Sequence, residues 1–220
     1  MDIIEGMHTR TSTRAFKPDP VPRETIEKII AAALRSPSYM NTQPWELAVV
    51  TGSRLKELSR LLIDLVTRDT PPSSDMPLPP PWPAALEKRL LDHALRRAEH
   101  IGIDLSDPKT RKELRITNYT FYGAPCVIFL FQDRSLGQWS IMDAGIFIQS
   151  FLLAAHACGL GVVSQGLLAD YPGQVRSFLG IPDTKRLLMG ISIGIADPAA
   201  QINSYRSHRA DMNELVQWYE

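Results

Sequence analysis

The stretch Asp143–Gly166, with the sequence DAGIFIQSFLLAAHACGLGVVSQG, decides the fold of this chain. Its first part predicts a helix in which only Asp143, Gln149, Ser150 and His156 are polar. A helix that is apolar nearly all round must be buried on nearly all sides. A chain of 220 residues has limited room for such a helix, so we expect a subunit interface to supply part of its cover.

Gly159 ends this helix, and the run GLGVVSQG that begins there predicts a short strand at Val162 and Val163. The run does not match the GxGxxG dinucleotide fingerprint, because no glycine-rich turn opens a helix here. Its glycines could let backbone N–H groups approach a ligand closely. They could equally serve only as a helix cap and a turn.

Outward from this stretch, apolar periodicity predicts helices and strands in mixed order. Strands are expected at 45–50, 126–131 and 187–195, and helices at 22–36, 53–65, 84–101, 109–122 and 170–179. This order favours an α+β fold with a mixed central sheet flanked by helices. Ser53 is expected to cap the helix after the first strand. The residues expected to face inward from 84–101 are Leu86, Leu90, Leu91, Ala94 and Leu95.

The length predicts a single domain over 1–220, with a proline-rich insertion at about 70–83. This insertion, TPPSSDMPLPPPWP, holds seven of the 17 prolines, so it is a loop or polyproline segment and not a helix or central strand. A link of this length is either functional or disordered. Trp82 could close over a ligand, or it could pack only against its own loop.

Composition excludes several classes of protein. The formal net charge is zero, so no global field attracts nucleic acid or an anionic membrane. The longest apolar run, Ala144 to Leu153, is too short to span a bilayer. The two cysteines, Cys126 and Cys158, lie in apolar runs, which suits buried thiols in a reducing compartment. We see no secretion signal at the N-terminus, and we expect a cytoplasmic protein.

Two arginine clusters stand at opposite ends of the chain. In RTSTR, Arg10, Ser12 and Arg14 point the same way if the segment is extended, and YRSHR near the C-terminus holds Arg206 and Arg209. The guanidinium fork matches phosphate. The two clusters could therefore converge on one phosphate, or they could be solvated surface arginines.

A polar stretch, SPSYMNTQPW at 36–45, joins the first predicted helix to the first predicted strand. Asn41 and Gln43 offer amide donors and acceptors, and Pro37 and Pro44 restrict the backbone around them. The pair could face a planar polar ligand, or the loop's polar groups could satisfy one another.

Chemistry by side chains is not evident. The sequence contains no HxxxH, CxxC, GxSxG or P-loop pattern, so neither a metal site nor a catalytic side chain is expected. His156 is read as a satisfied core residue, and Cys126 and Cys158 as inert packing. If the protein is an enzyme, a cofactor should carry the reaction.

Together these motifs resemble the nitroreductase-like, FMN-dependent flavoprotein family. The likeness runs through RTSTRAFKPDPVPRETIEKIIAAALRSPSYMNTQPWELAVVTG, GAPCVIFLF and DAGIFIQSFLLAAHACGLGVVSQG, and it ends with GISIGIADPAAQINSYRSHRADMNELVQW. It leaves out about 70–107. The resemblance implies a nitroreductase-like homodimer with an extended C-terminal tail and one FMN at each end of the interface.

The resemblance also implies the cofactor contacts. Arg10, Ser12 and Arg209 would hold the ribityl phosphate, with Arg206 nearby, and Thr11 is expected to be cofactor-binding as well.

Around the flavin ring, Arg14 would lie near the pyrimidine edge, with Asn118 as a further contact. Backbone groups of Gln165 and Gly166 would meet the N5 and O4 edge. The FMN held mainly by the other subunit would contact Pro37, Ser38 and Asn41, and Gln43 would face the same region.

The implied activity is hydride transfer from NADH or NADPH to flavin N5. A small electron-poor aromatic such as a nitroaromatic or quinone would then take the nicotinamide's place, which gives ping-pong kinetics. The same resemblance extends to reductive dehalogenases and to flavin-degrading enzymes, and a non-enzymatic flavin-binding module is a further alternative. The sequence leaves open the physiological acceptor and the choice between NADH and NADPH.

Overall fold

The computed structural model describes residues 2–76 and 81–220, so residues 77–80 of the proline-rich insertion lie outside the described part. A four-stranded sheet forms the centre, in the order β1-β2-β4-β3. The strands are β1 Glu46–Thr51, β2 Cys126–Asp133, β3 Gly161–Gln165 and β4 Lys185–Gly194. Neighbouring strands pair antiparallel. The parallel pairing found among the described residues is one bridge between Ser12 and Val162.

The helices confirm the α+β class and lie close to the predicted segments. Their bounds are α1 Ile3–Thr9, α2 Arg23–Ala33, α3 Gly52–Thr67, α4 Ala84–Ile101, α5 Pro108–Tyr119, α6 Gln138–Ala157, α7 Pro172–Leu179, α8 Gln201–Ser204 and α9 Met212–Leu215, with short 3₁₀ segments η1 Tyr39–Asn41, η2 Phe121–Gly123 and η3 Gly166–Ala169. The expected cap at Ser53 was wrong. Because α3 begins one residue earlier, Thr51 occupies the N-cap and Ser53 lies inside the first turn.

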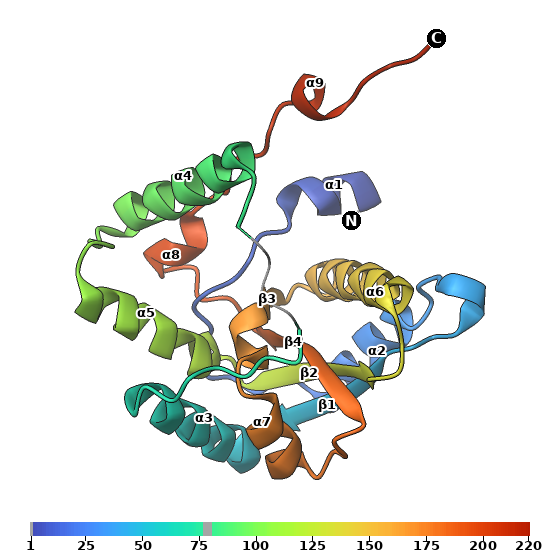
Figure 1. Ribbon diagram of the computed structural model, residues 1–220, viewed down its shortest axis with the longest axis vertical. Helices are drawn as coiled ribbons and strands as arrows, with labels where there is room; N and C mark the ends of the chain where they lie inside the picture. Colours follow the sequence, from blue (N-terminus) through green and yellow to red (C-terminus); the bar gives the residue numbers. More distant parts are fainter. Residues whose placement is uncertain (1, 77–80) are drawn as a thin grey trace.

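Strand β2 organises both faces of the sheet. Its side chains alternate between two cores: Val127, Phe129 and Phe131 belong to one, and Ile128 and Leu130 belong to the other. All are buried, as expected for a strand covered on both faces. Each such side chain contributes about 1.5–3 kcal/mol through burial. Helices α3 and α7 cover one face and α2 and α6 the other (Figure 1).

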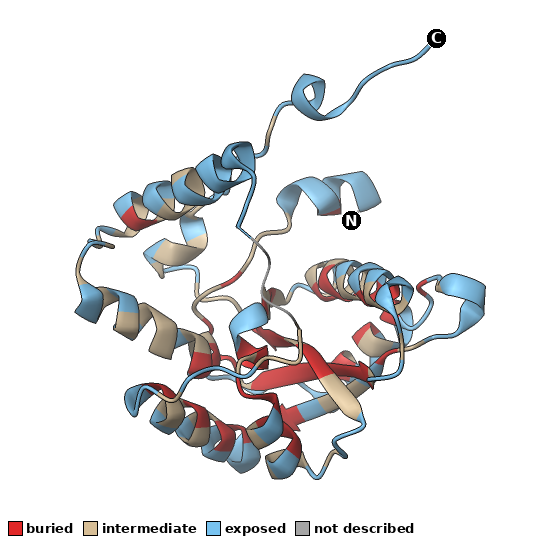
Figure 2. Ribbon diagram, viewed as in Figure 1, coloured by how far each residue is buried: buried red, intermediate tan, exposed pale blue. Residues whose placement is uncertain are grey.

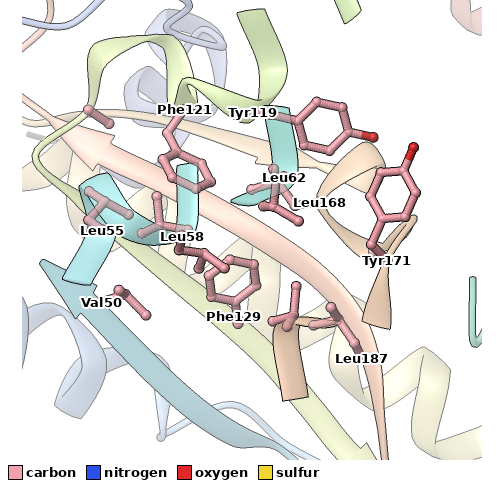
Figure 3. Packing of buried hydrophobic residues seen from close by; sticks show 14 of the residues in the cluster. Val50, Leu55, Leu58, Leu62, Tyr119, Phe121, Phe129, Leu168, Tyr171 and Leu187 are labelled. Atoms are coloured by element: carbon pink, nitrogen blue, oxygen red, sulfur yellow. The ribbon is translucent and has the colours of Figure 1, made fainter. Parts of the chain in front are cut away.

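The core under α3 also holds α5 in place (Figure 3). Tyr119, at the end of α5, is fully buried beside Leu58 and Leu62 of α3 and Tyr171. The Tyr119 hydroxyl donates to the Asp170 carboxylate over 2.8 Å. These contacts fix the C-terminal end of α5 against the sheet, which positions the residues that precede and follow Tyr119.

Helix α6 is the long apolar helix predicted from the sequence, and it begins earlier, at Gln138. Phe147 and Phe151 are buried in the core, and Phe147 stacks on Trp45. With 20 residues and a mean hydropathy of 1.3, α6 meets the length and composition of a membrane-crossing helix. Its longest apolar run, Ala144 to Leu153, is too short by itself to span a bilayer. Only 33% of it is buried, and Trp139 and Met142 are exposed. One chain therefore leaves one side of α6, with Trp139 and Met142, uncovered.

Helix α4 departs from the prediction. The leucines expected to face inward, Leu86, Leu90, Leu91 and Leu95, are 40–63% exposed, and Ala98 is the buried residue of this helix. The physical reason is the partner: α4 packs against the four-residue α8, which is too short to cover an apolar stripe. Figure 2 accordingly shows α4 largely exposed.

The chain beyond α8 has little cover. Leu215, Trp218 and Tyr219 are 62%, 76% and 88% exposed, and this segment extends away from the rest of the chain in Figure 1. Large apolar side chains held in water are unfavourable, so this tail has the composition of a segment that packs on another surface.

The first part of the proline-rich insertion is tied down by a buried ion pair. Asp75 and Arg176 are only 6% and 7% exposed and bind each other directly. The second carboxylate oxygen of Asp75 pairs with Arg134, and the Leu187 N–H also donates to Asp75 over 2.8 Å. A buried charge is stable only when it is paired and hydrogen-bonded in this way.

Replacing Asp75 with alanine should lower the free energy of unfolding by about 3–5 kcal/mol, because Arg176 would stay buried without its partner. Urea denaturation measures the loss. The matched control is Asp64→Ala, whose partner Arg68 is exposed and which should cost about 0.3–0.5 kcal/mol. Equal small losses in both variants would show that the buried pair does not anchor the insertion.

Candidate functional site

The segment Arg10–Arg14 runs along the outer strand β3. Thr13 donates its N–H to the Val162 carbonyl over 3.0 Å, and Ser12 forms the parallel bridge to the same residue. Thr13 is buried against Gly161, where an added Cβ would lie only 2.5 Å from the Thr13 hydroxyl. Position 161 therefore admits only glycine. Alternation places Arg10, Ser12 and Arg14 on the opposite, accessible side, and Thr11 on the side of Thr13.

The two ends of the chain meet at this segment through Asn203 of α8. The Arg14 N–H donates to Asn203 Oδ1 over 2.7 Å, and Asn203 Nδ2 donates to the Ala15 carbonyl over 2.8 Å. Arg209 lies close enough for its charge to act on Arg10: burial and then Arg209 lower the pKa of Arg10. The predicted convergence of the two clusters thus holds for Arg10 and Arg209.

Arg206 is placed differently. Its guanidinium donates to the carbonyl oxygens of Asn203 and Tyr205 over 2.8 and 3.2 Å, so it is bound to its own segment. Arg209 also donates to the Ser207 hydroxyl, but it keeps its electrostatic contact with Arg10.

Sequence reasoning missed Arg97 of α4. Burial lowers the pKa of Arg14, and the charge of Arg97 lowers it further. The same two guanidinium groups act on His93 and on Tyr122. The available signal was spacing: Arg97 follows His93 by four residues and so shares its helix face. Nothing in the sequence showed which way that face points.

A chain of hydrogen bonds continues from Arg14 toward the sheet. The Arg14 guanidinium lies close enough to the Tyr122 hydroxyl for the two groups to act on each other's pKa, and this hydroxyl donates to Asn118 Oδ1 over 2.8 Å. Gln165 Nε2 donates to the Asn118 carbonyl over 3.0 Å, and the Ser192 hydroxyl donates to Gln165 Oε1. Burial raises the pKa of Tyr122, so its hydroxyl stays protonated.

Gln165 is only 3% exposed, and its side chain is used inward by Asn118 and Ser192. Only its backbone is therefore available to a ligand, as the sequence interpretation requires. The next residue, Gly166, faces open space: an added Cβ would meet nothing within 4 Å. The arginine segment and the Gln165–Gly166 backbone thus lie at neighbouring positions along β3.

The polar loop before β1 is strained. Met40, Asn41 and Gln43 have φ values of 48°, 58° and 48°, which costs about 1–3 kcal/mol for each residue that is not glycine. Such strain is typical of functional loops. The Gln43 N–H donates to Ser38 Oγ over 2.9 Å, and Gln43 Nε2 to the Asn41 carbonyl over 3.3 Å. Gln43 thus bonds within the loop, and both Asn41 and Gln43 are exposed.

One chain does not bring this loop to the arginines. The loop after α2 lies at the α6 end of the molecule, and α4, α5 and α8 lie at the opposite end (Figure 1). Tyr39 fixes the loop there by donating its N–H to Asp143 of α6 over 3.0 Å. The predicted contacts Pro37, Ser38, Asn41 and Gln43 therefore cannot join Arg10 and Arg14 within one chain, which agrees with the expectation that they serve the site of another subunit.

A cavity of about 1140 Å³ lies elsewhere, between α2, α3 and the free edge of β1. Val49, Leu55 and Pro125 line it, with Arg60 at its rim. None of the predicted cofactor-binding residues contributes to it. The arginine site is therefore separate from this cavity.

The donor set fits a phosphate-bearing cofactor such as FMN. Within residues 2–76 and 81–220, none of Arg10, Arg14, Arg97 and Arg209 has a carboxylate within salt-bridge distance. Guanidinium groups gathered without acidic partners are favourable only when an anion joins them. Burial raises the pKa of Cys126 to about 12, so its thiol is unreactive.

Other candidates carry no chemistry. His156 Nε2 bonds the Thr9 hydroxyl over 2.8 Å, as expected of a satisfied histidine. Among the residues that the structure describes, no group of three or more His, Cys, Asp or Glu side chains could hold a metal ion.

Comparison with known proteins gives one consistent result. The pattern of the Nitroreductase family matches residues 7–195. The chain is 34% identical over 221 residues to the nitroreductase NfnB of Mycolicibacterium smegmatis, covering 98% of this chain and 91% of that protein. It is 34% identical over 216 residues to a 4-nitrobenzoate reductase of Pseudomonas putida, covering 94% and 91% of the two chains.

Solved structures agree. The crystal structure of the FMN-dependent nitroreductase NfnB from Mycobacterium smegmatis in complex with NADPH superposes with a TM-score of 0.94, at 32% identity and with full coverage of both chains. The likeness extends through the whole chain and so includes α4, which lies in the part that the motifs of the sequence left out.

Binding of an anion at the arginine cluster should raise the pKa of His93. Burial lowers the pKa of His93 from its usual value of 6.5, and the charges of Arg97, Arg14 and Arg209 lower it further. The smaller effect of Asp92 raises it. Because the unfolded chain takes up the proton more readily, the native state loses stability as the pH falls below about 6.5. Inorganic phosphate would offset the three positive charges.

NMR titration of the histidine rings measures this pKa with and without phosphate, and His93→Gln assigns the resonance. Arg97→Gln should raise the pKa of His93 without phosphate, because one repelling charge is removed. A pKa that does not respond to phosphate would contradict an anion site beside His93.

Proposed function

The chain belongs to the nitroreductase family, and from this membership we propose that it is an FMN-dependent oxidoreductase that reduces nitroaromatic compounds with NADPH or NADH. The observation that carries the proposal is the meeting of Arg10, Arg14 and Arg209 from opposite ends of the chain without acidic partners. Such a cluster suits a cofactor with a phosphate of about −2 charge.

The residues have distinct tasks in this proposal. Arg10, Ser12 and Arg209 bind the ribityl phosphate. Arg14 binds the pyrimidine edge of the ring, and there its charge stabilises negative charge that develops on reduction. Asn203 holds the Arg14 backbone, and Tyr122 lies beside its guanidinium.

The other contacts orient the ring and exclude water. The backbone of Gln165 and Gly166 meets one polar edge, and Asn118 supports Tyr122 and Gln165. When bound, FMN would accept a hydride from the nicotinamide donor and pass the reducing equivalents to an electron-poor aromatic. No side-chain acid or nucleophile is needed for that chemistry, in keeping with the unreactive Cys126.

We further propose a homodimer of single-domain subunits in the cytoplasm. The uncovered face of α6, with Trp139, Met142 and Ile146, and the exposed Ile3 and Ile4 of α1 form an apolar surface near the strained loop. A second copy would cover this surface and carry Pro37, Ser38, Asn41 and Gln43 to the site of its partner. The C-terminal tail adds a further apolar surface for the same contact.

The first test is reconstitution of the full chain with FMN. We expect a bound-flavin spectrum, bleaching of that spectrum by NADPH under anaerobic conditions, and turnover of nitrobenzene. A protein that gains no flavin spectrum would overturn the proposal. Bleaching without nitroarene turnover, but with loss of halide from a halogenated aromatic, would favour the dehalogenase alternative, and binding without bleaching would favour a flavin-binding module.

The same preparation tests the phosphate site. Arg10→Ala combined with Arg209→Ala should weaken FMN binding by about 1.5–3 kcal/mol for each charged hydrogen bond lost, without unfolding the chain. Quenching of FMN fluorescence gives the Kd. Arg96→Ala is the matched control, since Arg96 pairs with Asp92 on the exposed side of α4, and it should bind FMN as tightly as wild type. Full retention by the double variant would show that the two arginines do not hold the phosphate.

The shared site predicts that dimerisation and FMN binding fail together. Trp139→Glu with Ile146→Glu places two charges on the exposed face of α6 and should yield a monomer that binds FMN weakly. Analytical ultracentrifugation reports the mass and fluorescence the Kd. Leu95→Glu on the exposed face of α4 is the control and should remain dimeric. A monomer with wild-type FMN affinity would show that one chain suffices for the site.

A further inference from the structure

Helix α4 turns one face toward the arginine site. His93, Arg97 and His100 are spaced by four and three residues, so they share that face. The Tyr205 ring lies 5.6 Å from His93 and 5.5 Å from His100, between centroids, which fixes the direction of the face. Arg97 lies between the two histidines along the helix, and it is half-buried.

The position of α4 is set by α8. His100 Nε2 bonds the Ser204 hydroxyl over 2.8 Å, and Gln201 Nε2 donates to the His100 carbonyl over 2.6 Å. On its other side, α8 holds the backbone of Arg14 through Asn203. One short helix therefore connects Arg97 to Arg14, and the two guanidinium groups approach each other across it.

Arg97 differs from Arg89 and Arg96 of α4, because both of those arginines pair with a carboxylate. Arg96 pairs with Asp92 over 2.8 Å, and Arg89 pairs with Glu214 over 3.0 Å. Arg97 has no carboxylate within salt-bridge distance among the described residues, and its charge acts on Arg14 and on His93. A half-buried guanidinium in such surroundings gains most from an added anion.

The proposed cofactor does not supply that anion. Its phosphate carries about −2 charge, which Arg10 and Arg209 together offset, and Arg14 is assigned to the polar edge of the ring. The charge of Arg97 remains without a counterpart. It also lies on α4, which packs on α8.

We infer that Arg97 is a specificity-determining residue, which binds an oxyanion carried by the aromatic substrate or by the nicotinamide donor. The inference rests on the proposed function, because the ligand is taken to lie over the same site. A carboxylate on the aromatic ring and the 2′-phosphate of NADPH present the same chemistry to a guanidinium fork.

The test compares charged ligands with neutral or less charged partners of similar shape. FMN-loaded enzyme is titrated with benzoate and benzamide, and separately with NADP⁺ and NAD⁺, and the change in flavin absorbance gives each Kd without turnover. Arg97→Gln should weaken benzoate or NADP⁺ by roughly tenfold to hundredfold and leave benzamide and NAD⁺ nearly unchanged. The ligand pair whose Kd values become similar in Arg97→Gln identifies the source of the oxyanion.

Two further variants separate a binding role from a structural one. Arg97→Lys keeps the charge but not the fork, and should retain part of the preference. Arg96→Gln, one residue away and paired with Asp92, should behave as wild type. In Arg97→Gln, KM should rise for the ligand that carries the oxyanion, which is 4-nitrobenzoate or NADPH.

Three results would overturn the inference. The first is that wild type binds benzoate as tightly as benzamide and NADP⁺ as tightly as NAD⁺. The second is that Arg97→Gln and Arg96→Gln lose the same ligand affinity. The third is that Arg97→Gln binds FMN more weakly, by enough to explain its loss of ligand affinity. Failure of the proposed function is read separately, from FMN retention and nitrobenzene turnover of the wild-type enzyme. If both persist while discrimination does not depend on Arg97, only the present inference fails.

Discussion

Mutual repulsion of guanidinium groups is the constraint on which the rest of this structure depends. Arg10, Arg14, Arg97 and Arg209 come from the N-terminal segment, α4 and the tail. Burial and a neighbouring arginine lower the pKa of Arg10 and of Arg14. Folding energy must hold them together, because like charges in a partly buried site repel strongly. The buried β2 strand, the Thr13–Gly161 contact and the Asn203 bridge supply that support. A bound anion would offset these positive charges, so the repulsion between the arginines favours anion binding.

A second constraint is the division of the site between the ends of the molecule. The strained loop from Met40 to Gln43 is fixed to α6 through Asp143, far from the arginines. Helix α6 is apolar on a face that one chain leaves in water. In the proposed homodimer, a second copy would cover α6 and place the loop over the partner's cofactor. Stability of that assembly and completeness of the site would then be the same requirement.

The insertion combines firm and weakly held parts. Its beginning is fixed by the buried Asp75–Arg176 pair, whereas α4 touches the body mainly through α8. Elements with few buried contacts open most easily. A weakly packed helix that carries Arg97 and His93 suits a site where substrate and donor must enter in turn, because the helix can move without disturbing the core.

The sequence by itself determined the strands and most of the helices, because these follow from periodicities of two and 3.6 residues within short segments. It also determined that α6 is an apolar helix, and the structure shows Trp139, Met142 and Ile146 of this helix exposed. Only the tertiary structure decided that the Gln165 side chain is used internally, that the leucines of α4 are exposed, and that Arg97 lies near Arg14. Those outcomes depend on contacts between residues far apart in the chain, such as Asn203 with Arg14, and local pattern carries no information about which distant surface a helix face meets.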